Sequence, residues 1–183
     1  LIIISMTKKR CSWVSDDEIY IKYHDEEWGV PTHDDHELFE MLVLESFQAG
    51  LSWITILKKR ENFRKAFDDF DYVKISQYGE DKINELQNNK GIIRHKLKIN
   101  AAIKNAKVFM EIQNEFGSFD KYIWGFTDSK IIKAEFKTES ELSKTISKDL
   151  KKRGMSFVGP TIIYSYLESI GIIDNHQEDC FKF

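Results

Sequence analysis

The chain has 183 residues, of which 42% are hydrophobic and 31% are charged, as expected for one compact globular domain. No apolar run approaches the ~20 residues of a membrane-spanning helix, and two cysteines cannot form a disulfide framework, so we expect no membrane partner and a reducing, cytoplasmic location. The net charge of −3 argues against a protein that coats nucleic acid through bulk charge, but it leaves room for a local basic face.

The opening LIIIS is too short for the core of a signal peptide and has no basic residues before it. We expect residues 1–5 to be an upstream extension or cloning remnant, and residues 1–10 as a whole to lie outside the fold. Residues 11–183 are then predicted to form a single helical domain, either as one body or as two lobes around a pocket.

Only two prolines and few alternating runs predict an all-α protein. Apolar positions recur at helical spacing over residues 35–48, and Glu45 lies on the same face. Gly50 ends this helix, and Ser52 is expected to cap the next one, which runs beyond residue 60. Further along the chain we predict a short helix around 83–86, a long amphipathic helix from about 99 to 116, a short aromatic helix in FDKYIWGF, and a loop or lone strand in KIIKAEF.

The last third of the chain contains two helices joined by a glycine-bounded turn. The first is predicted from about Ser140 to Arg153 and ends at Gly154. The second opens with Pro160 at its first position and ends before Gly171. This is a helix-hairpin-helix pattern.

Three basic clusters interrupt the otherwise acidic chain: KKR at 58–60, RHKLK at 94–98 and KDLKKR at 148–153. Each cluster fits a solvated helix face, and each also fits a local surface for phosphates.

Each cysteine has a histidine nearby, Cys11 with His24 at the start and His176 with Cys180 at the end. A Cys2His2 set suits zinc, which accepts thiolate and imidazole ligands together. The same spacing fits two buried free thiols with unrelated histidines, or a disulfide between the two cysteines in a redox protein. The spacing alone leaves these alternatives open.

Four segments in the same order resemble the DNA-3-methyladenine glycosylase I family of the helix-hairpin-helix glycosylases: CSWVSDDEIYIKYHDEEWGVP at 11–31, LFEMLVLESFQAGLSWITILKKRENFRKAF at 38–67, GIIRHKLKINAAIKNA at 91–106 and LKKRGMSFVGPTIIYSYLESIGIIDNH at 150–176. The similarity runs from about residue 10 to the C-terminus. It implies an enzyme of base excision repair that flips 3-methyladenine out of alkylated double-stranded DNA, hydrolyses its N-glycosidic bond and releases the free base.

The resemblance also implies one structural zinc ion per chain, held by Cys11, His24, His176 and Cys180, which would tie the two ends of the chain together. Four protein ligands leave no open position for a water molecule, so the implied metal takes no part in catalysis.

For the base site the resemblance implies Glu45 as the catalytic residue, Trp53 as the ring on which the flipped base stacks and Tyr23 as a second polar contact. The pocket walls are then expected to include Trp13, Tyr20 and Trp28. Judged from its position alone, Glu45 fits a buried salt bridge or a frayed helix end equally well. Ser46 departs from the smaller residue expected there, which affects the expected shape of the pocket.

For DNA binding the resemblance implies that Gly50 and Leu51 press into the gap left by the flipped nucleotide, as apolar wedges do. The turn between the last two helices should contact phosphates through backbone N–H groups and basic side chains. Its expected contacts are Lys151, Lys152, Arg153, Gly154, Phe157, Val158 and Gly159.

No lysine lies between Lys152 and Lys182, which argues against a covalent lyase mechanism, and we assign Asp174 no catalytic function. The chain is expected to act as a monomer. The alternative function is a zinc-containing module that binds damaged DNA without catalysis.

Overall fold

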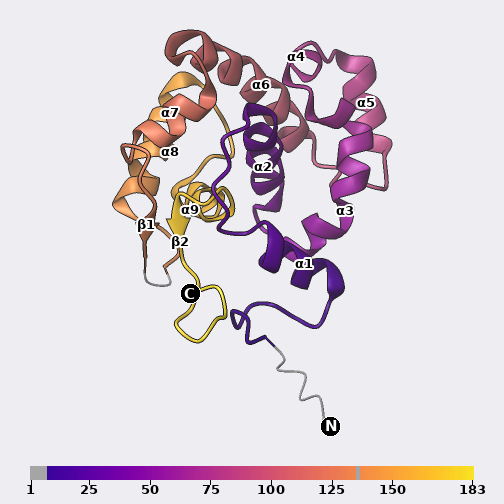
Figure 1. The fold of residues 1–183 in the computed structure, drawn as a ribbon. Coiled ribbons are helices and arrows are strands. Elements are labelled where there is room, and N and C mark those ends of the chain that lie inside the picture. Colours follow the sequence, from indigo (N-terminus) through magenta and orange to yellow (C-terminus); the bar gives the residue numbers. More distant parts are fainter. Residues whose placement is uncertain (1–7, 135–136) are drawn as a thin grey trace.

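The structure is a computed structural model of the chain, and it describes residues 8–134 and 137–183. Within these residues it is built almost entirely of helices, which confirms the predicted class (Figure 1). In chain order the elements are α1 (Glu18–Glu26), α2 (Asp35–Gln48), α3 (Trp53–Ala66), the 3-10 helix η1 (Asp68–Phe70), α4 (Tyr72–Ile75), α5 (Glu80–Asn88), α6 (Lys96–Phe116), α7 (Phe119–Gly125), β1 (Ile132–Lys133), α8 (Glu141–Arg153), α9 (Pro160–Ser169) and β2 (Ile173–Asp174).

Helix α2 lies at the centre of the molecule, with α3 and α5 to one side and α7 and α8 to the other (Figure 1). Every residue from 38 to 47 is buried, including two glutamates, because the helix is surrounded by other elements on all sides. Its predicted limits agree with those of the structure. Glu45 therefore sits in the interior of the protein and not on a surface stripe.

The segment around β1 corrects the expectation of a loop or lone strand. Its last two residues, 135 and 136, lie outside the described residues. Ile132 and Lys133 pair in parallel with Ile173 and Asp174 of β2. The partner lies some forty positions away, so alternation within the segment could not reveal the pairing. Helix α1, η1 and α4 were also not predicted, because each is short and buries few apolar residues.

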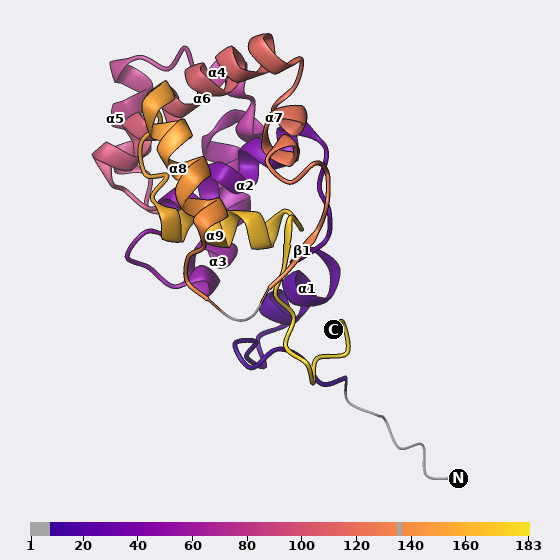
Figure 2. The same ribbon diagram turned by 90° about the vertical axis from the view of Figure 1, so that its left-hand side faces the viewer.

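Helices α8 and α9 form the predicted pair, and Figure 2 shows α8 crossing over α9. Gly154 ends α8 with φ of 108°, a left-handed conformation that favours glycine, and Pro160 opens α9. The turn between them, residues 154–159, joins the two helix ends as the sequence indicated.

The first and last described residues lie side by side (Figure 1). The Phe181 N–H donates to the Lys9 carbonyl at 2.8 Å, and the Arg10 guanidinium makes two hydrogen bonds to Asp25, at 2.8 and 2.7 Å. Lys8 Nζ also lies 4.7 Å from the centroid of the Phe181 ring, so residues 8–10 contact the domain, which corrects the expectation that all of residues 1–10 lie outside the fold. Residues 1–7 lie outside the described residues. No helix in the described part of the chain combines the length and hydropathy required to span a bilayer.

Gly171 packs directly against the chain that connects α1 to α2. Its φ is 80°, and a Cβ atom built there would come within 2.5 Å of the Val30 carbonyl carbon. Beside it the Thr32 N–H donates to the Ile170 carbonyl at 3.0 Å. This close backbone approach fixes the end of α9 relative to the first part of the chain.

We therefore expect Gly171→Ala to lower the free energy of unfolding by about 3 kcal/mol or more, because it adds both left-handed strain and a backbone overlap. Urea unfolding monitored by tryptophan fluorescence measures this change. Gly125→Ala is the control, since a Cβ there meets nothing within 4 Å and alanine favours helix, so its effect should stay within about 1 kcal/mol. Equal effects of the two substitutions would contradict the close-packing argument.

Candidate functional site

A cavity of about 290 Å³ opens between α1, α2, α3 and α9, a size that suits a small planar ligand. All six residues expected to form the base site line it. The walls consist of Trp13, Tyr20, Tyr23, Trp28, Glu45, Gln48, Trp53, Lys137, Thr138, Thr161, Tyr164, Ser165 and Glu168. The structure thus brings together an acidic side chain and five aromatic rings from three separate segments.

Glu45 is only 3% exposed, and its Oε2 atom is buried without a hydrogen-bond partner among the described residues. Burial raises the pKa of this carboxyl group well above its ordinary value, and the nearby charge of Glu168 raises it further. Buried polar atoms are normally satisfied, so an unpaired carboxylate oxygen that lines a cavity suggests a ligand that would complete it. The alternatives of a salt bridge or a frayed helix end do not fit these contacts.

The aromatic rings pack on one another around this carboxyl group. Tyr23 and Trp53 have ring centroids 5.5 Å apart, and Trp13 lies 5.0 Å from Tyr20 and 4.9 Å from Trp28. Trp53 Nε1 is also buried without a hydrogen-bond partner within the described chain, and so is the hydroxyl of Tyr164. The cavity therefore combines apolar faces with three unpaired polar atoms.

Three of the four expected metal ligands meet beside this cavity. Donor atoms of Cys11, His24 and Cys180 all lie within 4.8 Å of one another, and all three residues are buried. His24 Nε2 lies 3.4 Å from Cys180 Sγ. His176 is not in this group, but its ring centroid is 5.5 Å from that of His24. We call these four residues the terminal clasp.

Carboxylates orient both histidines of the clasp. Asp25 Oδ1 is 2.8 Å from His24 Nδ1, and Asp174 Oδ1 is 2.8 Å from His176 Nδ1, which leaves the Nε2 atom of each ring available. His176 Nε2 is buried and has no hydrogen-bond partner in the described residues. A carboxylate behind each ligating imidazole is the usual arrangement at zinc sites, so these residues fit the implied metal.

Burial makes the donor groups of the clasp favour their neutral forms in the absence of an ion. Burial raises the pKa of the Cys11 thiol to about 12, and the neighbouring Cys180 contributes to this increase. Burial also lowers the pKa of His24 and so favours the neutral imidazole that binds metals. A divalent ion would reverse the preference of the thiols and stabilise their thiolate forms.

The terminal clasp and the cavity share walls. His24 packs against Trp13 with ring centroids 5.4 Å apart, and His176 packs edge-on against Trp28 at 4.7 Å. A Cβ atom on Gly29 would approach the His176 ring to 2.7 Å, so the chain beside Trp28 also fits closely against the clasp. The clasp therefore fixes the positions of two indole rings that line the cavity.

The turn from residue 48 to 52 adjoins the cavity, because Gln48 at its start and Trp53 directly after it both line the cavity. Gly50 has φ of 80°, and Leu51 is 40% exposed. The buried Lys98 fixes this turn, since its Nζ donates to the carbonyls of Phe47 at 2.8 Å and Ala49 at 2.6 Å. A cation at these carbonyls also stabilises the C-terminal end of α2.

The turn of residues 154–159 is held by α6, the helix that also contains Lys98. Asn105 Nδ2 donates to the Ser156 carbonyl at 2.9 Å, and the Ser156 N–H donates back to Asn105 Oδ1 at 2.9 Å. Lys98 and Asn105 are seven residues apart and so lie two turns apart on the same side of α6. One helix thus holds both segments expected to contact DNA in a fixed relation.

The basic residues divide into exposed and internally paired ones. Lys151 and Lys152 are exposed, but Arg153 donates to Asp149 at 2.7 Å and to Glu115 at 2.6 Å. The pairing with Asp149 arises because Asp149 is one helical turn earlier, and the expected phosphate contact of Arg153 stays a prediction. The side chain of Val158 is fully buried, so this residue offers only its backbone.

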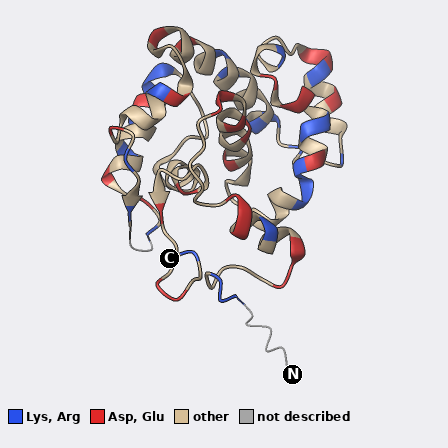
Figure 3. Ribbon diagram, viewed as in Figure 1, with Lys and Arg blue, Asp and Glu red and all other residues tan. Residues whose placement is uncertain are grey.

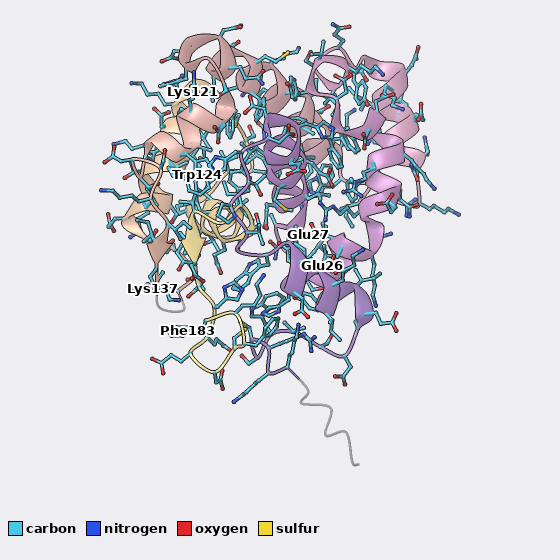
Figure 4. The ribbon with its side chains drawn as sticks, in the orientation of Figure 1. Glu26, Glu27, Lys121, Trp124, Lys137 and Phe183 are labelled. Atoms are coloured by element: carbon cyan, nitrogen blue, oxygen red, sulfur yellow. The ribbon has the colours of Figure 1, made fainter. Side chains whose placement is uncertain are left out.

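Similar pairing occurs on α3, where Figure 3 shows basic and acidic residues interspersed. The Arg60 guanidinium binds Glu27 and Glu40, both at 2.6 Å, beside a larger cavity of about 740 Å³. Glu27 is labelled in Figure 4. Arg60 and Glu40 are largely buried, whereas Glu27 is 40% exposed. Because these charges satisfy one another, the residues beside the larger cavity form a structural ion-pair network, and nothing there indicates a ligand site.

The sequence model of the methyladenine glycosylase family matches residues 13–183. The chain belongs to this family. It is 45% identical over 177 residues to the DNA-3-methyladenine glycosylase of Haemophilus influenzae, a match that covers 93% of this chain and 96% of that protein.

Solved structures of family members have the same fold. A crystal structure of 3-methyladenine DNA glycosylase I superposes with a TM-score of 0.92 at 45% identity, covering 94% of this chain and 98% of the other. A tyrosine-to-phenylalanine variant of 3-methyladenine DNA glycosylase I, in complex with 3-methyladenine, superposes with a TM-score of 0.90 at 36% identity, covering 94% and 96%. The helical architecture described above is thus that of the methyladenine glycosylase family.

Sequence reasoning missed seven of the residues that line the cavity of this family member, among them Lys137, Tyr164 and Glu168. Tyr164 and Glu168 lie with Thr161 and Ser165 at helical spacing on one face of α9, a pattern that the sequence does contain. Lys137, labelled in Figure 4, follows β1 and is exposed, and no sequence signal places it at the cavity. The orienting carboxylates Asp25 and Asp174 were also missed, although each lies within two residues of a clasp histidine.

The raised pKa of Glu45 predicts a pH-dependent stability effect. Because the folded state holds this proton more tightly than the unfolded state, the contribution of Glu45 to stability is greatest below the ordinary pKa of 4.5 and falls as pH rises above it. Glu45→Gln should therefore be more stable than the wild type at pH 8, with the difference shrinking toward pH 4.

Urea unfolding at a series of pH values measures this difference in the free energy of unfolding. The control is Glu141→Gln, which removes a carboxyl group that is 90% exposed and should show no such trend. A wild-type protein that is more stable than Glu45→Gln at pH 8 would argue that the carboxylate has an ionic partner.

Proposed function

We propose that this chain is a monofunctional DNA glycosylase of base excision repair, which hydrolyses the N-glycosidic bond of 3-methyladenine in alkylated double-stranded DNA. The observation that carries the proposal is the unpaired, buried carboxylate of Glu45 among aromatic rings. The names and bound 3-methyladenine of its relatives support the same function.

The substrate explains the composition of the cavity. 3-Methyladenine carries a positive charge while it is attached to deoxyribose, whereas adenine is neutral. The faces of Trp53 and Tyr23 attract a desolvated cation by roughly 0.5–2 kcal/mol each. Glu45 balances the charge and accepts a hydrogen bond from the amino edge of the base. Together these contacts favour the damaged base over the large excess of undamaged adenine.

The reaction requires little acid catalysis because the attached base is already cationic. When the bond between the sugar carbon and the ring nitrogen breaks, its electron pair passes to the ring and the base leaves as a neutral molecule. The oxygen of a water molecule forms the new bond to the sugar carbon and loses a proton. No lysine in the turn of residues 154–159 offers an amine for a covalent intermediate, so we propose hydrolysis without lyase activity.

Access to the base requires that its nucleotide leave the duplex. We propose that Gly50 and the exposed Leu51 occupy the gap that remains, beside the cavity into which the base rotates. The turn of residues 154–159 then contacts the phosphate backbone through its N–H groups, with Lys151 and Lys152 adding sequence-independent attraction. Arg153 instead fastens α8 to α6 through Glu115, which supports the position of that turn.

We also propose one structural zinc ion per chain, held by Cys11, His24, His176 and Cys180. The fit of the two carboxylate-oriented histidines and the unpaired Nε2 atom of His176 support this proposal. When bound, zinc supplies a tetrahedral cross-link between the two ends of the chain and no activated water. Two buried free thiols suit a reducing, cytoplasmic location, and we expect the enzyme to act as a monomer.

The central test is release of free 3-methyladenine from methylated double-stranded DNA by the purified protein. Wild type should release the base, and Glu45→Gln should reduce the rate by about 10- to 100-fold, because a hydrogen bond to a charged group contributes about 1.5–3 kcal/mol. Glu141→Gln, which removes an exposed charge, should retain wild-type activity. A folded wild-type protein that binds abasic DNA but releases no methylated base would instead identify a non-catalytic damage-binding module.

Zinc content tests the clasp separately from activity. Mass spectrometry under native conditions should find about one zinc per chain with both thiols reduced. Asp174→Asn should weaken zinc binding by about 10- to 100-fold in a competition with a colorimetric chelator, because it removes a carboxylate behind a ligand. Glu178→Gln, which changes an exposed carboxylate in the same tail, is the matched control and should bind zinc normally. A disulfide between Cys11 and Cys180 in zinc-free protein would refute this assignment.

A further inference from the structure

Glu168 is a second carboxyl group in the cavity that accommodates the base, and no feature of packing explains its charge. It belongs to the face of α9 that lines the cavity. Its backbone carbonyl accepts hydrogen bonds from the Gly29 N–H at 3.1 Å and the Gly171 N–H at 3.2 Å. The backbone of Glu168 is therefore held both by the chain that follows α1 and by the chain that follows α9. Its Oε2 atom accepts one hydrogen bond, from Asn175 Nδ2 at 3.3 Å.

These contacts need an acceptor but not a negative charge. A glutamine side chain has the same shape and would accept the Asn175 hydrogen bond with its own carbonyl oxygen. No lysine, arginine or histidine of the described chain forms a salt bridge with Glu168. Glu168 is half-buried. A partly desolvated carboxylate without an ionic partner costs stability, so a structural function alone would be served better by glutamine.

The charges of the residues that line the cavity indicate that the missing partner of Glu168 is a cationic ligand. Its charged lining residues are Glu45, Glu168 and Lys137 in the described chain, and Lys137 is exposed at the rim. Burial raises the pKa of Glu168 to about 7, and the charge of Glu168 in turn raises the pKa of Glu45. Two acidic groups thus compete for protons in a cavity whose interior, as far as the described residues line it, offers no positive side chain. A cationic ligand would relieve both groups at once.

We propose that Glu168 determines specificity for positively charged purines, because it makes the cavity a receptor with two carboxylates that face the base from α2 and α9. This inference rests on the proposed function and extends it. Glu45 supplies both charge and a hydrogen bond at the edge of the base, whereas Glu168 contributes charge from the part of the wall formed by α9. The cavity then rejects neutral adenine by leaving two acidic groups without compensation.

The test compares two small ligands of similar shape that differ in charge. The 3,9-dimethyladeninium cation carries a permanent positive charge and mimics the attached damaged base, and 9-methyladenine is its neutral counterpart. Binding to the zinc-loaded full chain is measured by quenching of tryptophan fluorescence and by calorimetry. The variants are Glu168→Gln, Glu168→Asp and the exposed-charge control Glu141→Gln, each checked for folding by thermal melting.

We expect wild type and Glu141→Gln to bind the cation more tightly than the neutral purine. Glu168→Gln should weaken binding of the cation by about tenfold, corresponding to about 1.4 kcal/mol, and leave binding of the neutral purine unchanged. Glu168→Asp keeps the charge but withdraws it by one methylene group, so it should weaken cation binding by a smaller factor. If Glu168→Gln does not fold, Glu168→Asp alone provides the test.

An unchanged preference for the cation in either Glu168 variant overturns the inference, and so does an equal loss of affinity for both ligands, which would indicate a change of shape. The proposed function fails in a different way. If wild type shows no preference for the cation and releases no 3-methyladenine from methylated DNA, the enzyme assignment itself is wrong. If wild type does both and the Glu168 variants match it, only the function of Glu168 is refuted.

Discussion

The structure depends on keeping the carboxyl group of Glu45 away from water and without an ionic partner among the residues that the structure describes. Such a group destabilises a fold, and it persists only where the surrounding elements hold it firmly in place. Here α2 is buried on all sides, so the helix cannot turn to expose the carboxylate. The fully packed central helix and the unpaired acid are thus two aspects of the same arrangement, which under the proposed function favours the binding of a cationic base.

The remaining elements support this arrangement from two directions. Helix α6 links the two turns expected to contact DNA, because Lys98 holds the carbonyls at the end of α2 and Asn105 holds Ser156. The terminal clasp acts from the other side, where His24 and His176 pack against indole rings of the cavity wall. Under the proposed function, the same framework would therefore position both the base site and the two turns expected to contact the duplex.

Much of this organisation was predictable from sequence, for identifiable reasons. Helical periodicity located Glu45 on a buried face, and the glycine and proline positions gave the limits of α8 and α9 closely. The spacing of Cys11 and His24 could not distinguish a metal site from two thiols until the family resemblance was added, because ligands from opposite ends of a chain have no fixed separation. Glu168 was missed although α9 carries the pattern, since one acidic residue at a helical position does not reveal what faces it. Pairings that depend on tertiary contact, such as β1 with β2, have no local signal.

The terminal clasp joins residue 11 to residue 180, and this has a consequence for biosynthesis. Contacts between such distant positions close a very long loop and form late in folding, after the helices between them. A nascent chain on the ribosome therefore lacks the walls supplied by Trp13 and Trp28 in their final positions until almost all of the chain has emerged. Incomplete translation products of this protein should therefore lack a complete cavity and be unable to excise bases from DNA.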